Sequence, residues 1–262
     1  MILTKPKHLS AILLSLAMVV PVAAHATVVE VRTVLGNFEV NLFDEATPET
    51  VENFLSYVNS GSYANNVVHR TEANFVMQAG GFTYNNVFPP TPIQTGAAVI
   101  NEPVFSNVRG TIAMAKVGGN VNSATSQWFI NVNNNAANLD VQNGGFTVFG
   151  QVLGNGMAVV DAITSTPNFE FDGAFNSIPL RNYTSADQAA GKTPTDSNLV
   201  LMTDIVVVNA DVVTNSNLNP VRNTLLDTGR DDGSSSSSGG SMGTFLVSLM
   251  AVFTLRRRLL KA

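Results

Sequence analysis

Short apolar runs separated by turn residues fill residues 28–208, and this pattern is the strongest constraint on the fold. Residues 28–34 and 38–43 alternate apolar and polar side chains, with Gly36-Asn37 between them. Alternation with a period of two on both sides of such a pair predicts a β-hairpin whose turn is at Gly36-Asn37. Many short strands predict a closed or nearly closed antiparallel barrel, because closure leaves no strand edge exposed. The further expected strands are 66–70, 75–79, 111–116, 128–133, 147–151 and 202–208.

Two segments have the period of a helix instead. Thr47 suits the N-cap position, Pro48 suits the first helical position, and Gly61 is a typical residue after a helix end. Between them, one apolar stripe recurs at helical spacing and consists of Val51, Phe54, Leu55 and Val58. A second helix is expected at residues 157–164.

The N-terminal end has the composition of a removable signal peptide. Lys5, Lys7 and His8 precede an apolar run at residues 9–22, and Ala24-His25-Ala26 supplies small residues at the two positions that signal peptidase requires. The apolar run is shorter than the ~20 residues of a membrane-spanning helix. We therefore expect cleavage after Ala26 and export to the periplasm of a Gram-negative bacterium.

The C-terminal end has a different targeting pattern. Five serines at 234–238 and the triplet Gly239-Gly240-Ser241 precede an apolar run at 244–255 and three arginines at 256–258. A Ser/Gly tract is typical of a flexible linker, and arginines after an apolar run favour the cytoplasmic side of a membrane. The order resembles the GlyGly-CTERM sorting signal. That resemblance implies transient membrane anchoring, cleavage by a rhomboid-type protease, and then release or attachment to the cell surface; an uncut anchor is the alternative.

These features divide the chain into four parts, with boundaries that serve as expectations. Residues 1–26 form the signal peptide, and residues 27–211 form one domain with a polar inserted loop at 166–198. Residues 212–240 form a flexible linker, and residues 241–262 form the apolar sorting or anchor segment with its basic end. We expect a monomer.

Composition excludes several classes of function. A formal net charge of -5 and a pI of about 5.1 argue against a nucleic-acid partner, which needs a basic face. The chain has no cysteine, which excludes disulfides and thiol chemistry. Once the leader is removed, His69 is the only histidine, so a metal site built on several imidazoles is excluded. A nucleophile elbow and a phosphate-binding loop are also absent, and neither a metal nor a cofactor is expected.

The sequence instead resembles one family along most of its length. Residues 68–81 (VHRTEANFVMQAGG) closely resemble the cyclophilin motif F-H-R-x-x-x-x-F-M-x-Q-G-G. Further blocks follow the family's order around that motif, at 50–55 (TVENFL), 110–115 (GTIAMA), 126–130 (SQWFI) and 139–150, which holds Leu-Asp and FTVFG. The chain is thus identified as similar to the bacterial branch of the cyclophilins.

The resemblance implies a mainly β fold, a closed eight-stranded antiparallel barrel capped by two α-helices. It also implies peptidyl-prolyl cis-trans isomerase activity without a cofactor. The barrier to X-Pro rotation is about 20 kcal/mol, so uncatalysed rotation takes tens of seconds or more. The expected substrates are proline-containing peptides and unfolded exported proteins, whose folding the enzyme would assist.

The family positions also imply roles for individual residues. Arg70 would donate to the proline nitrogen as the amide twists, and Gln78 and Gln127 would bond the substrate backbone. His69 would shape the site, with a purely structural histidine as an equal alternative. Ala115 would line the groove through its backbone. The apolar pocket for the proline ring is assigned to Phe75, Val76, Phe129 and Leu139, and Phe146 is a further substrate-binding residue.

The chain departs from the family pattern at some of these positions. Val76 replaces the usual Met, which shortens one side of the pocket, and Phe146 replaces the His of many eukaryotic members. Asn138 replaces a common Trp and argues against tight cyclosporin binding. A second hypothesis is a binding module that keeps the groove and holds proline-containing peptides without turnover, and a structural surface protein is a third.

Overall fold

The computed structural model describes residues 27–210 and 218–226. The expected signal peptide and the apolar sorting segment therefore lie outside the described residues. Among the described residues, no helix combines the length and apolarity needed to cross a membrane.

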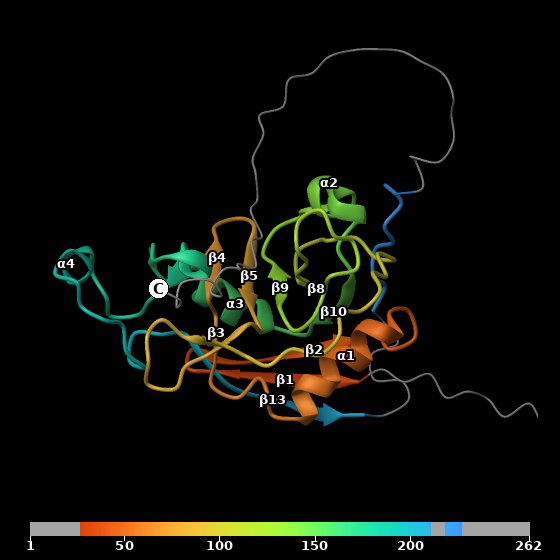
Figure 1. Ribbon diagram of the computed structural model, residues 1–262. Helices are drawn as coiled ribbons and strands as arrows, with labels where there is room; N and C mark the ends of the chain where they lie inside the picture. The colour runs from red at the N-terminus through yellow and green to blue at the C-terminus, as the bar shows by residue number, and fades with distance from the viewer. Residues whose placement is uncertain (1–26, 211–217, 227–262) are drawn as a thin grey trace, which may run out of the picture.

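One antiparallel sheet of eleven strands organises the described chain (Figure 1). Its strands are β1 (Val28–Thr33), β2 (Gly36–Leu42), β3 (Asn66–Val67), β4 (Arg70–Glu72), β5 (Val76–Ala79), β6 (Phe82–Thr83), β7 (Thr91–Pro92), β8 (Thr111–Met114), β9 (Trp128–Asn131), β10 (Val148–Val152) and β13 (Leu201–Asn209). The order of neighbours is β4-β5-β9-β8-β10-β2-β1-β13-β3-β6-β7. The predicted mainly β class is confirmed.

The sheet curls because β3 and β4 are two halves of one stretch. β3 pairs with β13, whereas β4 pairs with β5 at the other end of the strand order. Between them, the Val68 amide donates to Val200 and the His69 amide donates to Gln78. The same stretch therefore joins both ends of the sheet. With β3 and β4 counted as one strand, and the two-residue β6 and β7 set apart, the curled sheet has the eight strands that the resemblance implied.

The first hairpin turns earlier than predicted. Gly36 already pairs with Thr33 as the first rung of the β1–β2 ladder, so Val34 and Leu35 form the turn. The Thr33 hydroxyl accepts from the Leu35 amide at 3.1 Å and donates to the Gly36 carbonyl at 2.6 Å. The prediction of a turn at Gly36-Asn37 was wrong because the Thr33 side chain holds the chain reversal one step earlier.

Helix α1 (Pro48–Asn59) lies along one side of the sheet, and α3 (Gly156–Thr164) packs near β2. Both helices were expected from the sequence. Thr47 occupies the N-cap position of α1, but its hydroxyl donates to the Phe43 carbonyl at 3.2 Å. The Glu102 carboxylate instead accepts from the Thr50 amide at 2.9 Å and the Thr50 hydroxyl at 2.7 Å. A carboxylate at a helix start is favourable because the helix dipole is positive there.

The two faces of the curled sheet carry two separate apolar clusters. On β5, Met77 belongs to the larger cluster and Val76 to the smaller one; on β9, Ile130 and Phe129 divide in the same way. Successive side chains of a strand point to opposite faces, so the clusters lie on opposite sides of the sheet. The larger cluster also receives α1 through Val51, Phe54, Tyr57 and Val58.

The segment expected as an inserted loop contains structure of its own. β11 (Asn168–Phe169) pairs with β12 (Ile178–Pro179), and α4 (Ser185–Ala189) begins with a capping box of Thr184 and Asp187. The segment contributes to a third buried cluster that consists of Val67, Phe169, Phe175, Ile178, Leu180, Tyr183 and Leu199. Hydrogen bonds donated by the Asn168 and Ser177 side chains to the Thr71 carbonyl hold this segment beside β4.

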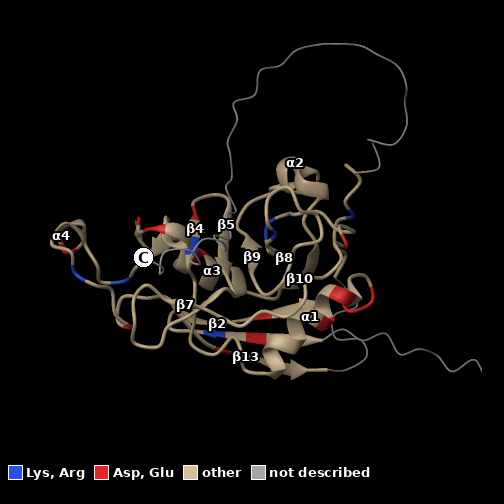
Figure 2. Cartoon of the chain, in the orientation of Figure 1, with Lys and Arg blue, Asp and Glu red and all other residues tan. Residues whose placement is uncertain are grey.

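Charged residues are sparse on the ribbon, and acidic ones mark the start of α1 (Figure 2). Residues 218–226 fall within the predicted linker, yet they pack against the domain: Arg222 forms an antiparallel bridge with Phe105. The linker expected over 212–240 therefore includes a packed stretch.

Candidate active site

Strand register brings three predicted site residues into one row. Arg70 on β4 is paired with Gln78 on β5, and Gln78 is paired with Phe129 on β9. Directly opposed residues of neighbouring strands point to the same face, with Cβ atoms about 5 Å apart. Val76 lies two residues before Gln78 and therefore shares this face. An arginine, a glutamine and an apolar surface are thus placed side by side by the sheet itself.

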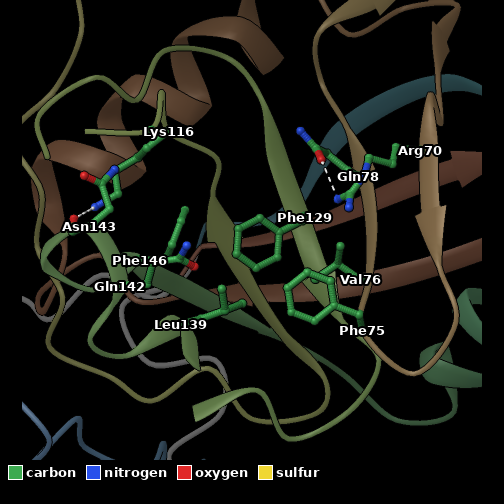
Figure 3. Close-up of a pocket in the computed structure, with 11 residues that line it drawn as sticks. Arg70, Phe75, Val76, Gln78, Lys116, Phe129, Leu139, Gln142, Asn143 and Phe146 are labelled. Atoms are coloured by element: carbon green, nitrogen blue, oxygen red, sulfur yellow. Dashed lines mark hydrogen bonds between the residues drawn. The ribbon is translucent and has the colours of Figure 1, made fainter. Parts of the chain in front are cut away.

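An apolar pocket adjoins this row (Figure 3). The rings of Phe129 and Phe146 meet edge to face at 5.8 Å. Leu139 stands at the end of α2 (Ala136–Leu139), and its carbonyl accepts from the Phe146 amide at 2.9 Å. All seven predicted residues of this region line the pocket: Arg70, Phe75, Val76, Gln78, Phe129, Leu139 and Phe146.

Arg70 lies at the polar rim of this pocket. Its guanidinium donates to the Gln78 side chain at 3.4 Å and lies 3.3 Å from the Glu72 carboxylate. Gln78 in turn donates to the Gln127 side chain at 2.9 Å. Burial lowers the pKa of Arg70, and the Glu72 charge opposes that shift. These contacts hold the guanidinium in a partly buried position, where a donated hydrogen bond is stronger than in bulk water.

The opposite wall of the pocket depends on Lys116. Its ammonium donates to the Asn143 and Gly145 carbonyls at 2.8 and 2.6 Å and lies 4.9 Å from the centre of the Phe146 ring. The residue is 3% exposed, and burial lowers the pKa of Lys116 to about 8. Lys116 therefore ties η1 (Gln142–Gly144) and the following Gly145 to the segment that follows β8.

A wider groove continues from the same row. Its cavity volume is about 410 Å³, against about 30 Å³ for the apolar pocket. The predicted residues His69, Ala115 and Gln127 line this groove, whereas Arg70, Gln78 and Lys116 border both cavities. One further wall is formed by residues 172–176, which include the turn η2 (Gly173–Phe175). The predicted set is thus divided between two adjoining cavities.

His69 is neutral at physiological pH. It is 2% exposed, and burial together with the Arg70 charge lowers the pKa of His69 to about 3. Its ring meets the edge of Phe82 at 4.9 Å, and its Nδ1 has no partner among the described residues. A histidine with this pKa does not exchange protons near pH 7, so its position favours shaping the groove over acid–base chemistry.

Sequence reasoning missed several residues around the pocket. Lys116, Gln142 and Asn143 line it, and Lys116 directly follows the GTIAMA block, which was the available signal. The buried carboxylate of Asp140 was also missed; it accepts from the Ser106 hydroxyl and from the Asn107 amide at 2.7 Å. No cluster of three or more potential metal ligands occurs in the part of the chain that the structure describes.

Comparisons with known proteins agree on one family. The family model described as "Cyclophilin type peptidyl-prolyl cis-trans isomerase/CLD" matches residues 28–184, more than half of the chain. A peptidyl-prolyl cis-trans isomerase of Acinetobacter baylyi is 40% identical over 164 residues, which cover 60% of this chain and 84% of the relative.

Two further similarities extend this result. Peptidyl-prolyl cis-trans isomerase B of Escherichia coli is 40% identical over 134 residues, covering 49% of this chain and 78% of that protein. In fold, the chain is similar to the crystal structure of a cyclophilin type peptidyl-prolyl cis-trans isomerase of Cryptosporidium parvum. That match has a TM-score of 0.51 and 21% identity, covering 70% of this chain and 98% of the other.

Proposed function

This chain belongs to the family of cyclophilin-type peptidyl-prolyl cis-trans isomerases, and on that premise we propose that it isomerises X-Pro bonds in exported proteins and so assists their folding outside the cytoplasm. It is an isomerase of the class EC 5.2.1.8. The observation that carries the residue-level proposal is the row of Arg70, Gln78 and Phe129 beside an apolar pocket.

In this proposal the pocket holds the proline ring. A proline ring is apolar and compact, and the pocket wall offers the faces and edges of Phe75, Phe129 and Phe146. Gln78 and Gln127 lie beside it with amide groups suited to the peptide backbone on either side of the proline. Binding the ring this way leaves the preceding carbonyl free to rotate.

Arg70 then favours the twisted amide. Rotation removes the C–N double-bond character and leaves a lone pair on the proline nitrogen. The guanidinium donates a hydrogen bond to that lone pair, an interaction that the planar ground state cannot make. A donor placed in advance where charge develops lowers the barrier, and each 1.36 kcal/mol gives a factor of ten in rate.

The location outside the cytoplasm is supported by sequence features. The charged start, the apolar run at 9–22 and Ala24-His25-Ala26 match a signal peptide, and a chain without cysteine needs no oxidative folding step there. The order of Gly239-Gly240, apolar run and arginines supports a transient membrane stage with rhomboid-type cleavage, followed by release or surface attachment.

Expression of the full chain in a Gram-negative host tests the location. We expect mass spectrometry to find Thr27 at the mature N-terminus and fractionation to find the protein outside the cytoplasm, whereas Ala26→Leu should leave the leader attached. The mature protein should also accelerate refolding of an exported protein whose folding is limited by proline isomerisation. Retention in the cytoplasm with the leader intact would contradict export; binding of proline peptides without acceleration would favour the binding-module hypothesis.

A further inference from the structure

Residues 218–226, here called the C-terminal strap, form an added strand-like segment on the domain (Figure 1). The Ser106 amide donates to the Val221 carbonyl at 2.8 Å, and the Asn223 amide donates to the Val104 carbonyl at 2.9 Å. The strap lies beyond residues 28–184, so the family match does not account for it.

The stretch that the strap covers packs behind the wall of the proline pocket. Phe105, paired with Arg222 of the strap, is 7% exposed and packs in the cluster that also contains Phe129, Leu139 and Phe146. Its ring meets that of Phe43 at 5.0 Å. The strap is thus one layer behind the pocket, separated from it by Phe105.

Asn223 makes the most direct connection. It is 9% exposed, and its side-chain amide donates to the Asp140 carbonyl at 2.9 Å, immediately after Leu139. Its side-chain oxygen accepts from the Leu225 amide at 3.0 Å. Asn223 therefore bonds both the end of α2 and the strap itself.

Asp140 links that bond to the rest of the site. Its carboxylate accepts from the Asn107 amide at 2.7 Å and from the Asn107 side chain at 3.0 Å. The same Asn107 side chain donates to the Phe146 carbonyl at 3.2 Å. At the strap's end, a Cβ added to Gly145 would lie 3.2 Å from Leu226, so Leu226 also packs against the pocket loop.

We propose that the C-terminal strap is a positioning element for the proline pocket, acting through Asn223 on Asp140 and hence on Leu139 and Phe146. This inference rests on the proposed use of the pocket for the proline ring. The strap carries no group that reaches the substrate; it holds the backbone from which two pocket walls project. A gap of about 1 Å forfeits roughly half of a van der Waals contact, so a wall that moves by this much holds the proline ring measurably less tightly.

The test compares the full chain with Asn223→Ala, Asn223→Asp and Arg222→Ala. Asn223→Ala removes both side-chain bonds, whereas Asn223→Asp loses the donor to Asp140 and keeps an acceptor for the Leu225 amide. Arg222→Ala changes an exposed side chain of the same strap and serves as the matched control. For each protein, kcat and KM for an X-Pro peptide and the midpoint of thermal unfolding are measured, with the assay well below that midpoint.

We expect both Asn223 variants to raise KM about tenfold with kcat within a factor of two, and Arg222→Ala to match the parent in both. A merely structural strap would lower the unfolding midpoint and leave KM unchanged; that result would overturn the proposal. If Asn223→Ala does not fold, Asn223→Asp decides alone, and an unchanged KM in that variant overturns it as well. If the parent chain itself shows no isomerase activity, that result contradicts the proposed function and says nothing against the role of the strap.

Discussion

The apolar pocket and the wider groove share Arg70, Gln78 and Lys116 but are built in different ways. One side of the pocket stands on paired strands, where Val76 and Phe129 are each 3% exposed. The groove is walled largely by connecting segments, which include residues 172–176. Rigid strands set positions closely, whereas loops tolerate change. We therefore expect the pocket to determine the rate of rotation and the groove to determine which peptides are favoured.

The largest effect is expected at the shared rim. Arg70→Lys keeps the charge but loses the planar fork, so the donor no longer reaches the proline nitrogen while held by Gln78. We expect kcat/KM for an X-Pro peptide to fall about 100-fold. Arg32→Lys, at an exposed ion pair with Glu30, is the control and should be unchanged. If kcat/KM of Arg70→Lys stays within threefold of the parent value, the guanidinium has no part in the proposed mechanism.

The groove residue His69 should affect stability more than rate. Its folded pKa of about 3 lies below the ordinary value of 6.5, so between these values the unfolded chain binds the extra proton. Stability from this residue is complete above pH 6.5 and is lost as the pH falls toward 3, by up to about 1.4 kcal/mol per pH unit. In urea unfolding at pH 7, 5.5 and 4.5, the free energy of unfolding should decline less steeply with falling pH for His69→Gln than for the parent.

The same variant separates shaping from proton transfer. At pH 7 the activity of His69→Gln should remain within about threefold of the parent, because a neutral imidazole contributes no proton there. If the free energy of unfolding falls equally with pH in parent and variant, His69 is not the acid-sensitive group. If the variant loses most of its activity at pH 7, His69 takes part in the catalytic step.

Lys116 tests whether the pocket depends on a loop as well as on strands. Lys116→Met keeps the aliphatic stem and removes both bonds to the Asn143 and Gly145 carbonyls, so kcat/KM should fall about tenfold. The parent's activity should also decline above pH 8 as the ammonium deprotonates, since its pKa is about 8, and the variant should lack that decline. Lys192→Met, at an exposed pair with Asp187, is the control. If the activity of the parent and of Lys116→Met changes with pH in the same way, deprotonation of Lys116 is not the cause of the decline.

The smallest effect is expected in the groove wall. Asp172 is exposed and lines the groove, so it should favour peptides with a basic residue near the proline. Asp172→Asn should reduce that preference about threefold at low salt and leave neutral peptides unaffected, because exposed charge interactions are weak and screened. Asp196→Asn, exposed elsewhere in the same segment, is the control. If Asp172→Asn changes kcat/KM equally for basic and neutral peptides, Asp172 does not contribute to substrate preference.

Local pattern predicted the longer strands and both main helices, but not the two-residue strands β6, β7, β11 and β12, because alternation and helical spacing need several neighbouring residues to show. The row of Arg70, Gln78 and Phe129 needed the family resemblance, since register between strands far apart in sequence leaves no local trace. Lys116, Glu102 and Asn223 were missed for a related reason. Each one acts on main-chain groups of a distant segment, at Asn143, Thr50 and Asp140 respectively.

The stretch 66–72 pairs with β13 at its start and with β5 at its end, and His69 and Arg70 lie where it changes partner. The stretch that closes the sheet therefore continues directly into the arginine that we propose acts on the substrate. We therefore expect this enzyme, which acts on unfinished proteins, to gain its own activity during refolding no earlier than its sheet closes.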